Sequence, residues 1–322
     1  MNNFKKIGLT ALAGSLVATS AFAGELTASG SASMSVKNTT SNGIQAYSPT
    51  LGGDSSTGKS FSMGNSVYLA GSGELDNGLT VSMSFELDQG TANNSSNGFD
   101  NHYVEVGSDA LGTLRLSGHG GSSAQSAMDT TAAGDLWNNT LGLSGGVAAA
   151  AAGDNSLFYT LPAIMDGVAI TASMSPGRAA QETHTSFGVV YTGVEGLTLK
   201  LGTGDSGAPA AEIETTTMMA SYAIGSFTAS ASHTDADKTG AADREVTSYQ
   251  IAYTVSDNLS LTYGEETFDL TGDAIDEEVS GFGASYTTGG MTLSAQTYKA
   301  ENITTTAGAE VEKWALTAAF AF

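Results

Sequence analysis

Two short glycine-rich motifs are the patterns in this sequence that most resemble sites of chemistry. Residues 142–146 (Gly-Leu-Ser-Gly-Gly) have the G-x-S-x-G spacing that presents a nucleophilic serine at a strand-to-helix turn. Residues 202–207 have the G-x-G-x-x-G spacing that places a phosphate at a helix N-terminus. The first motif lies in a Gly/Ala-rich run without a positioned histidine, and no helix is predicted after the second. Because 41 glycines make such matches frequent by chance, we predict that the protein is not an enzyme.

Metal binding is the second chemistry that the side chains could provide. The four histidines are dispersed without a recognisable ligand spacing, and the chain contains no cysteine. Acidic loops, however, offer the hard oxygen ligands that Ca²⁺ prefers. We therefore treat Ca²⁺ in outer loops as a hypothesis, with solvated loop charge as the alternative, and expect that no cofactor is required. The candidate ligands are Asp235, Asp237, Asp273, Asp276, Glu277 and Glu278.

A third set of charged residues alternates with apolar residues along strand-like segments. Arg115 lies between Leu114 and Leu116, and Lys200 lies between Leu199 and Leu201. Opposed charges across a narrow, water-filled gap create a field that orients and filters solutes, although each residue could equally be a solvated one. The candidates for lining such a gap are Arg115, His119, Lys200, Glu86, Asp88 and Glu105 in strands, with Asp129, Asp135 and Asp154 in one long connection.

Strict alternation of apolar and polar residues is the dominant pattern along the chain. In residues 79–88 the odd positions are apolar and the even positions are small, polar or charged. A period of two places the two sets on opposite faces of a strand. We count about sixteen such segments: 25–37, 60–75, 79–88, 99–107, 112–119, 155–162, 167–175, 184–192, 197–203, 215–224, 226–234, 244–256, 259–268, 278–287, 291–299 and 313–322.

The connections between these segments alternate between short and long. The short ones are tight turns such as Asp76-Asn77-Gly78 and Thr288-Gly289-Gly290. The long ones are polar and variable, and the longest, about 120–154, follows the fifth segment. In an antiparallel meander every second connection lies on the same side, so one end would carry only turns and the other only loops. This asymmetry is typical of outer-membrane barrels.

These patterns predict an all-β fold, a closed antiparallel transmembrane β-barrel of about sixteen strands. In hydrocarbon every backbone N–H and C=O must be paired within the protein, so a membrane-spanning sheet has to close on itself. One face of each strand then meets lipid, and the polar face surrounds a lumen that we expect to hold water rather than a packed core. A soluble β-sandwich would show less regular loop asymmetry, and a β-solenoid would show a fixed repeat.

The N-terminus and the charge balance agree with export. Residues 1–23 combine a basic start, a short apolar stretch and an Ala-x-Ala-type cleavage site, which indicates a signal peptide, so we expect domain boundaries at 1–23 and 24–322. Removing Lys5 and Lys6 leaves 9 basic and 33 acidic residues, a net charge of −24. So acidic a chain lacks the basic face that nucleic-acid binding needs.

The sequence resembles the general diffusion porins of alphaproteobacteria, and the resemblance extends from about Glu25 to Phe322. The resemblance rests on the signal peptide, the strand meander and the terminal Ala319-Phe320-Ala321-Phe322, which looks like the signal read by barrel-assembly machinery. It implies a sixteen-stranded homotrimer in the outer membrane of a Gram-negative bacterium. It also implies that segment 120–154 folds inward and constricts the pore. Only three arginines are present, fewer than the arginine cluster that constrictions of this family usually contain.

The leading hypothesis is therefore a water-filled channel for passive diffusion of small hydrophilic solutes and ions, with a preference for cations. Its surroundings would be outer-membrane lipid and lipopolysaccharide. The alternative is a barrel without channel function, acting as a structural or adhesive surface protein through its long loops. Stepwise currents in planar bilayers separate the two hypotheses.

Overall fold

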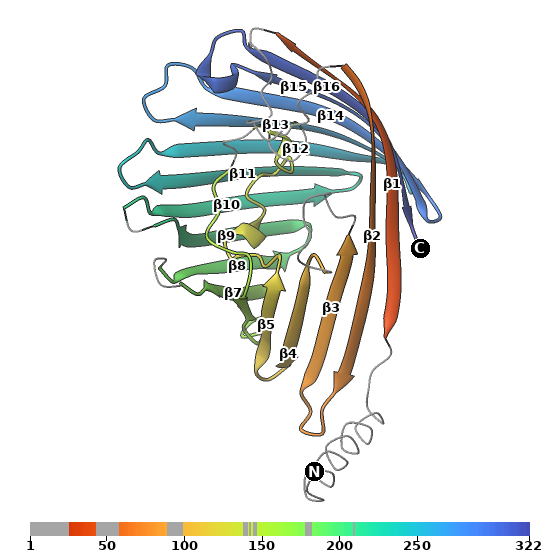
Figure 1. Ribbon diagram of the computed structural model, residues 1–322, viewed down its shortest axis with the longest axis vertical. Coiled ribbons are helices and arrows are strands. Elements are labelled where there is room, and N and C mark those ends of the chain that lie inside the picture. The colour runs from red at the N-terminus through yellow and green to blue at the C-terminus, as the bar shows by residue number, and fades with distance from the viewer. Residues whose placement is uncertain are drawn as a thin grey trace, which may run out of the picture.

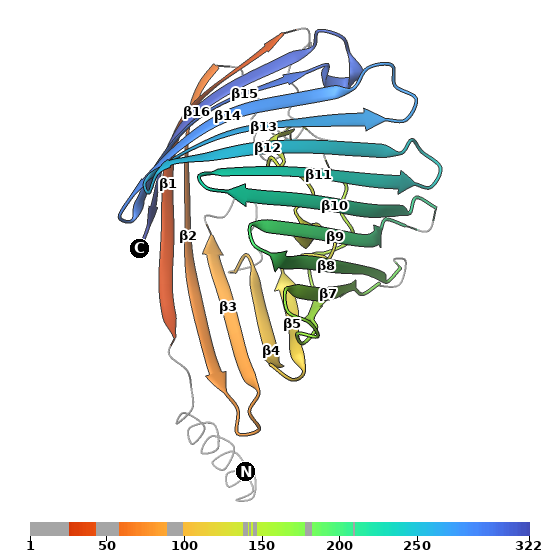
Figure 2. The ribbon, with the colours of Figure 1, turned by 180° about the vertical axis from the view of Figure 1, so that it is seen from behind.

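The computed structural model describes residues 26–42, 58–88, 99–137, 141, 143, 147–177, 182–208 and 210–322. Its sixteen strands follow one another round a single wall (Figures 1 and 2). They are β1 Thr27–Asn42, β2 Gly58–Glu74, β3 Thr80–Asp88, β4 His102–Ser108, β5 Gly112–His119, β6 Ser156–Thr160, β7 Val168–Ser175, β8 His184–Val194, β9 Leu197–Ser206, β10 Ile213–Ile224, β11 Phe227–Lys238, β12 Arg244–Ser256, β13 Leu259–Leu270, β14 Glu277–Thr288, β15 Met291–Glu301 and β16 Glu310–Ala321.

The sheet closes on itself, as the sequence predicts. Each strand pairs antiparallel with its sequence neighbours, and β1 pairs with β16 from Ser31↔Ala321 to Asn42↔Glu310. The last residue completes the closure, because the Phe322 amide donates to the Gly30 carbonyl at 3.0 Å and Gly30 donates back at 2.6 Å. Closure leaves no sheet edge to pair with another chain.

The short connections are tight turns at one end of the barrel. Several turn at a glycine with positive φ, among them Gly78, Gly167 and Gly196 at 75–81°. L-residues with a Cβ rarely adopt this conformation, so glycine is the natural residue there. The long connections lie at the other end. Two of them contain a short 3-10 helix, η3 (Ser126–Met128) and η5 (Ile303–Thr305). Within the described part of the chain, no helix is long and apolar enough to cross a membrane.

All sixteen predicted segments are strands, but several extend further toward the long-loop end than predicted. Strand β1 runs to Asn42 rather than 37, β11 to Lys238 rather than 234, and β16 begins at Glu310 rather than 313. Beyond the apolar zone a strand keeps its backbone pairing but no longer needs an apolar face. The alternation that defined the predicted boundaries is therefore lost before the strand ends.

Candidate functional site

The wall has two chemically different faces. In β3, Met83 and Leu87 point outward and are 40% and 41% exposed, whereas the inward Glu86 is 6% exposed. The register of pairing extends this division around the barrel. Exposed outward apolar residues include Leu114, Leu116, Leu201, Met218 and Ile251. The parity predicted from sequence is therefore correct for Arg115, Lys200, Glu86, Asp88 and Glu105, which all lie on the inward face.

The segment that follows β5 runs along the inner wall. Figures 1 and 2 show it as the yellow trace inside the barrel. Backbone amides of this segment donate to hydroxyl groups on inward positions of four strands. The pairs are Ala124 N to Ser173 Oγ at 2.9 Å and Ser186 Oγ at 2.8 Å, Ala132 N to Ser232 Oγ at 2.7 Å, and Ala133 N to Ser248 Oγ at 2.8 Å. The four hydroxyls come from β7, β8, β11 and β12.

Side chains of the segment strengthen this attachment. Gln125 is fully buried, and its Nε2 donates to Thr217 Oγ1 of β10 at 2.7 Å. Its Oε1 accepts from the Ala150 amide at 2.8 Å, so Gln125 also joins the outgoing and returning halves of the segment. Both the donor and the acceptor of the side-chain amide therefore have a hydrogen-bond partner, as burial of a polar group requires.

Glu266 of β13 holds the returning turn of the segment. Its Oε1 accepts from the Leu136 amide at 2.9 Å, and its Oε2 accepts from the Trp137 amide at 3.2 Å. The residue is 1% exposed. Both oxygens of the buried carboxyl group therefore have a hydrogen-bond partner, as burial of a polar group requires. Sequence analysis did not single out Glu266, although its inward parity follows from Tyr263 and Glu265 facing outward.

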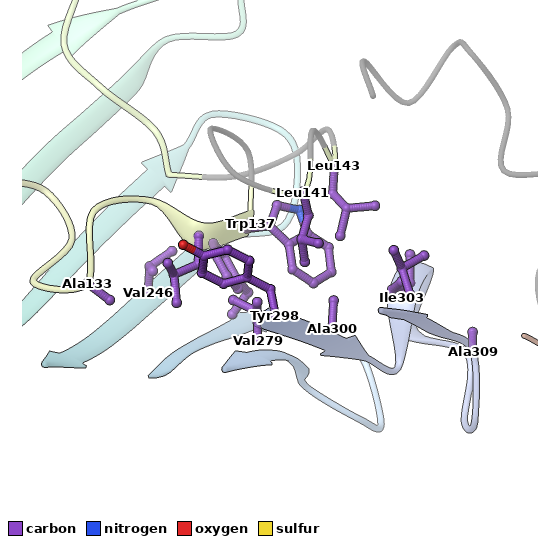
Figure 3. Packing of buried hydrophobic residues seen from close by; sticks show 13 residues of the cluster. Ala133, Trp137, Leu141, Leu143, Val246, Val279, Tyr298, Ala300, Ile303 and Ala309 are labelled. Carbon is purple, nitrogen blue, oxygen red and sulfur yellow. The ribbon is translucent and has the colours of Figure 1, made fainter. Parts of the chain in front are cut away.

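An apolar cluster fills the long-loop end of the lumen beside β12–β16, and Figure 3 shows its packing. Trp137, 1% exposed, packs on Phe268 of β13 with ring centroids 5.0 Å apart. The expectation of a lumen without a packed core is therefore wrong on this side, because here the inward positions themselves are apolar. The cluster comprises Ala133, Leu136, Trp137, Leu141, Leu143, Val246, Phe268, Val279, Tyr298, Ala300, Ile303, Ala309 and Val311.

An ion pair borders the apolar cluster. Arg244 Nη2 lies 2.7 Å from Glu277 Oε2, and the Arg244 guanidinium lies over the Phe268 ring at 5.1 Å. Glu277, a Ca²⁺ candidate, is thus engaged with a base, and its Oε1 also accepts from the Thr304 amide at 2.9 Å. These contacts tie the loop containing η5 to β12 and β14.

The opposite side of the lumen, beside β2–β6, contains a cavity of about 500 Å³. Glu86 lines it and accepts hydrogen bonds from two neutral donors, Tyr68 Oη at 2.6 Å and Asn101 Nδ2 at 2.7 Å. Asp88, the next inward residue of β3, accepts a hydrogen bond from Ser66 Oγ at 3.2 Å. Neutral donors stabilise a carboxylate without cancelling its charge, so this wall of the cavity stays negative.

Arg115 and Glu105 form an ion pair on the same cavity. Arg115 Nη2 and Nε lie 2.8 Å and 2.9 Å from Glu105 Oε2. The guanidinium also stacks over the Tyr103 ring at 4.1 Å. The register places Arg115 directly opposite Glu105 in neighbouring strands, which explains the pairing. The sequence predicted that both residues face inward, but it did not predict that they neutralise each other.

The remaining predicted site residues fall into separate contacts. His119 Nδ1 lies 3.3 Å from Asp100 and its Nε2 lies 3.7 Å from Asp154, so the structure brings His119 and Asp154 together. Lys200 is paired with Asp129 of the inner segment. Asp135 lies apart from these groups, in the turn that Glu266 holds, with a positive φ of 56°.

A second basic group faces the lumen from β1 and β16. The group consists of Lys313 and Lys37, which are not among the candidates chosen from the sequence. Lys37 shares its parity with the inward Ser35 and Thr39, and Thr39 is the partner of Lys313 across the strands. Arg178 lies outside the described residues.

The calcium candidates do not gather into one site among the described residues. Asp235 is opposite Glu245 and Asp237 is opposite Glu214 across neighbouring strands. Asp276 contributes its carbonyl oxygen to Asn302 Nδ2 at 3.1 Å. In the described part of the chain, no group of three or more His, Cys, Asp or Glu side chains is arranged to hold a metal ion. Calcium binding, including at Asp273 and Glu278, stays a prediction.

Comparison with known proteins identifies the family. A sequence model described as Gram-negative porin matches residues 8–321. Among curated proteins, no sequence matches this chain significantly. Among solved structures, a porin refined at 1.8 Å is 18% identical with a TM-score of 0.67, covering 92% of this chain and all of that one.

Two further solved structures share the fold. The anion-selective porin from Comamonas acidovorans is 14% identical with a TM-score of 0.66, covering 92% of this chain and 99% of that one. OmpT of Vibrio cholerae, described in a trimer form, is 14% identical with a TM-score of 0.64, covering 93% of this chain and all of that one.

Proposed function

The chain belongs to the Gram-negative porin family, and as an outer-membrane porin it forms a channel. We propose that this channel passes small hydrophilic solutes and ions by passive diffusion. We also propose that it prefers cations. The Comamonas porin has the same fold and is described as anion-selective. The fold alone therefore does not require a preference for cations, and the proposal rests on the residues that line the lumen.

The observation that supports a cation preference is the difference in how lumen charges are paired. Arg115 is neutralised by Glu105, and Lys200 is paired with Asp129. Glu86 instead has two neutral donors and keeps its charge. The lysines on β1 and β16 oppose this effect from across the lumen. Charges beside a pore act on ions through a region of reduced dielectric, so they are felt more strongly than charges in bulk water.

Reversal potentials across a planar bilayer under a KCl gradient test the proposed preference. We expect cation selectivity in dilute salt that fades in concentrated salt, because the Debye length falls from about 10 Å at 0.1 M to about 3 Å at 1 M. A zero or anion-selective potential in dilute salt would overturn the proposal. A complete absence of stepwise currents would instead favour the structural or adhesive alternative.

We also propose that the segment between β5 and β6 constricts the pore. Its hydrogen bonds to inward hydroxyls of β7, β8, β11 and β12 support this role. So does the ion pair of Asp129 with Lys200, which places a carboxylate of the segment in the lumen. A constriction made by this segment would widen when its attachment is broken, and single-channel conductance measures this directly.

The mature protein is proposed to start at Gly24 and to assemble as a homotrimer. Residues 1–23 lie outside the described residues, and N-terminal sequencing of the membrane-inserted protein tests the cleavage site. The trimer form of OmpT supports the assembly by analogy of fold. Ala229 and Ala231 point outward on β11, and small outward residues suit close subunit packing. A protein that sediments as a monomer in mild detergent would contradict the trimer.

The finer family assignment and the surroundings are also proposals. We propose that the chain is of the alphaproteobacterial general diffusion type, and that outer-membrane lipid and lipopolysaccharide surround it. The outward apolar residues, such as Leu116, Leu201 and Ile251, support contact with hydrocarbon.

A further inference from the structure

The cavity beside β2–β6 has a lining that differs from a simple charged passage. Five of its residues carry rings, and it also contains two carboxylates, an amide and a guanidinium. The rings belong to Tyr68, His102, Tyr103, His119 and Phe158. At about 500 Å³ the cavity is larger than an inorganic ion needs. Aromatic faces attract organic cations through the ring quadrupole.

The charge in this cavity is unevenly compensated. Arg115 is paired with Glu105 and covers one face of Tyr103, so the guanidinium is already engaged. Glu86 is held at 2.6 Å by Tyr68 and at 2.7 Å by Asn101, and both donors are neutral. The two contacts fix the carboxylate in one orientation beside the Tyr68 ring. A fixed negative charge next to an aromatic ring is a recognition element for an organic cation.

We propose that this cavity is a saturable binding subsite for small organic cations, centred on Glu86 and Tyr68. The inference rests on the proposed channel function, because it adds a binding step along the diffusion path. A potassium ion keeps its hydration shell and gains mainly from the carboxylate, whereas a weakly hydrated organic cation also gains from ring contact. Such solutes should therefore occupy the cavity long enough to interrupt potassium current.

Choline and its uncharged carbon isostere, 3,3-dimethyl-1-butanol, are a matched pair of probes. Added to the purified full-length protein in planar bilayers at low KCl, choline should reduce the potassium current with a saturating concentration dependence. The isostere has the same shape without the charge and should have no effect. Equal reduction by both probes, or no saturable reduction by choline, would overturn the proposal.

Two substitutions locate the subsite. Glu86→Gln keeps the size of the side chain and should raise the half-saturating choline concentration about tenfold. Asp88→Asn removes the same charge from the same strand and face, but residue 88 does not line the cavity. It changes the general lumen potential and should leave the choline block within about twofold. Equal weakening by both substitutions would show that only the general potential matters, and would overturn the subsite.

The potassium reversal potential, measured on the same channels, distinguishes failure of the subsite from failure of the proposed ion preference. A cation-selective channel without choline block would refute the subsite and leave the proposed function intact. A non-selective channel would refute the cation preference, whereas choline block weakened by Glu86→Gln and not by Asp88→Asn would still support the subsite.

Discussion

The two sides of the lumen use the same alternating pattern for opposite purposes. Beside β2–β6 the inward positions are polar or charged, and they surround a cavity of about 500 Å³. Beside β12–β16 the inward positions near the loop end are apolar, and they are buried under the segment that contains Trp137. The outward faces of both sides are apolar in the same way. The difference shows that the membrane fixes only one face of each strand, and that the other face is free to line water or to form a core.

The inner segment connects the two sides. Its outgoing half is held by hydroxyl groups, its returning turn by Glu266, and its middle by the apolar cluster. These attachments differ in strength, so they can be broken one at a time to find which of them keeps the channel narrow.

The largest expected effect comes from removing the centre of the apolar cluster. Trp137→Ala deletes a side chain that is 1% exposed, and truncations of this kind cost about 3–5 kcal/mol. We expect the barrel to assemble, because its wall does not depend on this residue, while single-channel conductance and current noise increase. The control is Trp314→Ala, which removes an outward tryptophan that is 38% exposed and should leave conductance unchanged. Identical conductance in Trp137→Ala and the native protein would show that the cluster does not position the segment.

The second-largest effect is expected from a charge placed on the lipid face of β3, and it tests the division between outward and inward faces. Val81→Arg places a charge on the lipid face of β3, at a cost of roughly 2–4 kcal/mol near the bilayer midplane. Its neighbour Ser82 faces inward, so Ser82→Arg should assemble and alter conductance instead. Heat-modifiable migration on gels measures the folded fraction of each variant. If both variants assemble equally well, the register assigned to β3 is wrong.

An intermediate effect is expected at Glu266. Glu266→Gln keeps one oxygen acceptor but turns an amide NH₂ toward the other backbone N–H, and an unsatisfied buried donor costs about 1–3 kcal/mol. We expect the returning turn to loosen and the conductance to rise less than in Trp137→Ala. Glu265→Gln removes the same charge from the outward neighbour, whose carboxylate accepts from Tyr263. A larger conductance change in Glu265→Gln than in Glu266→Gln would refute the anchoring role.

The smallest effect concerns the ion pair of the outgoing half. Asp129 is 54% exposed, and exposed pairs contribute about 0–1 kcal/mol, so Lys200→Gln should leave the segment in place. It removes a positive charge from the lumen and should make the reversal potential slightly more cation-selective. Lys299→Gln, on the outward face, serves as the control. A shift toward anions in Lys200→Gln would mean that Asp129 had moved out of the passage.

The sequence predicted the wall well because the bilayer imposes its pattern. Residues that face lipid have to be apolar, so the positions of Leu114, Leu116 and Ile251 define parity without knowledge of the fold. The turns were predictable for a similar reason, since positive φ requires glycine at positions such as Gly78 and Gly167. Strand number and order follow from these two signals.

The filled side of the lumen was not predicted, because its apolar residues lie on the parity that was expected to be polar. Phe268 points inward and is 1% exposed. Val246, Val279 and Val311 share this inward parity near the loop end of their strands. Apolar residues on the polar parity of several neighbouring strands are a usable signal for an internal core. The pairing of Arg115 with Glu105 required the register, which alternation alone does not give.

The central proposal is that solutes pass along the β2–β6 side, while the apolar cluster closes the loop end beside β12–β16. It can be tested with single cysteines. The chain has no native cysteine, so one introduced thiol is the only reactive group of its kind. Ser84→Cys lies in the wall of the open cavity, and Val246→Cys lies in the apolar cluster at a position that is 1% exposed. A cationic methanethiosulfonate reagent should lower the current through Ser84→Cys and leave Val246→Cys unreacted. Modification of Val246→Cys as fast as Ser84→Cys would contradict this account.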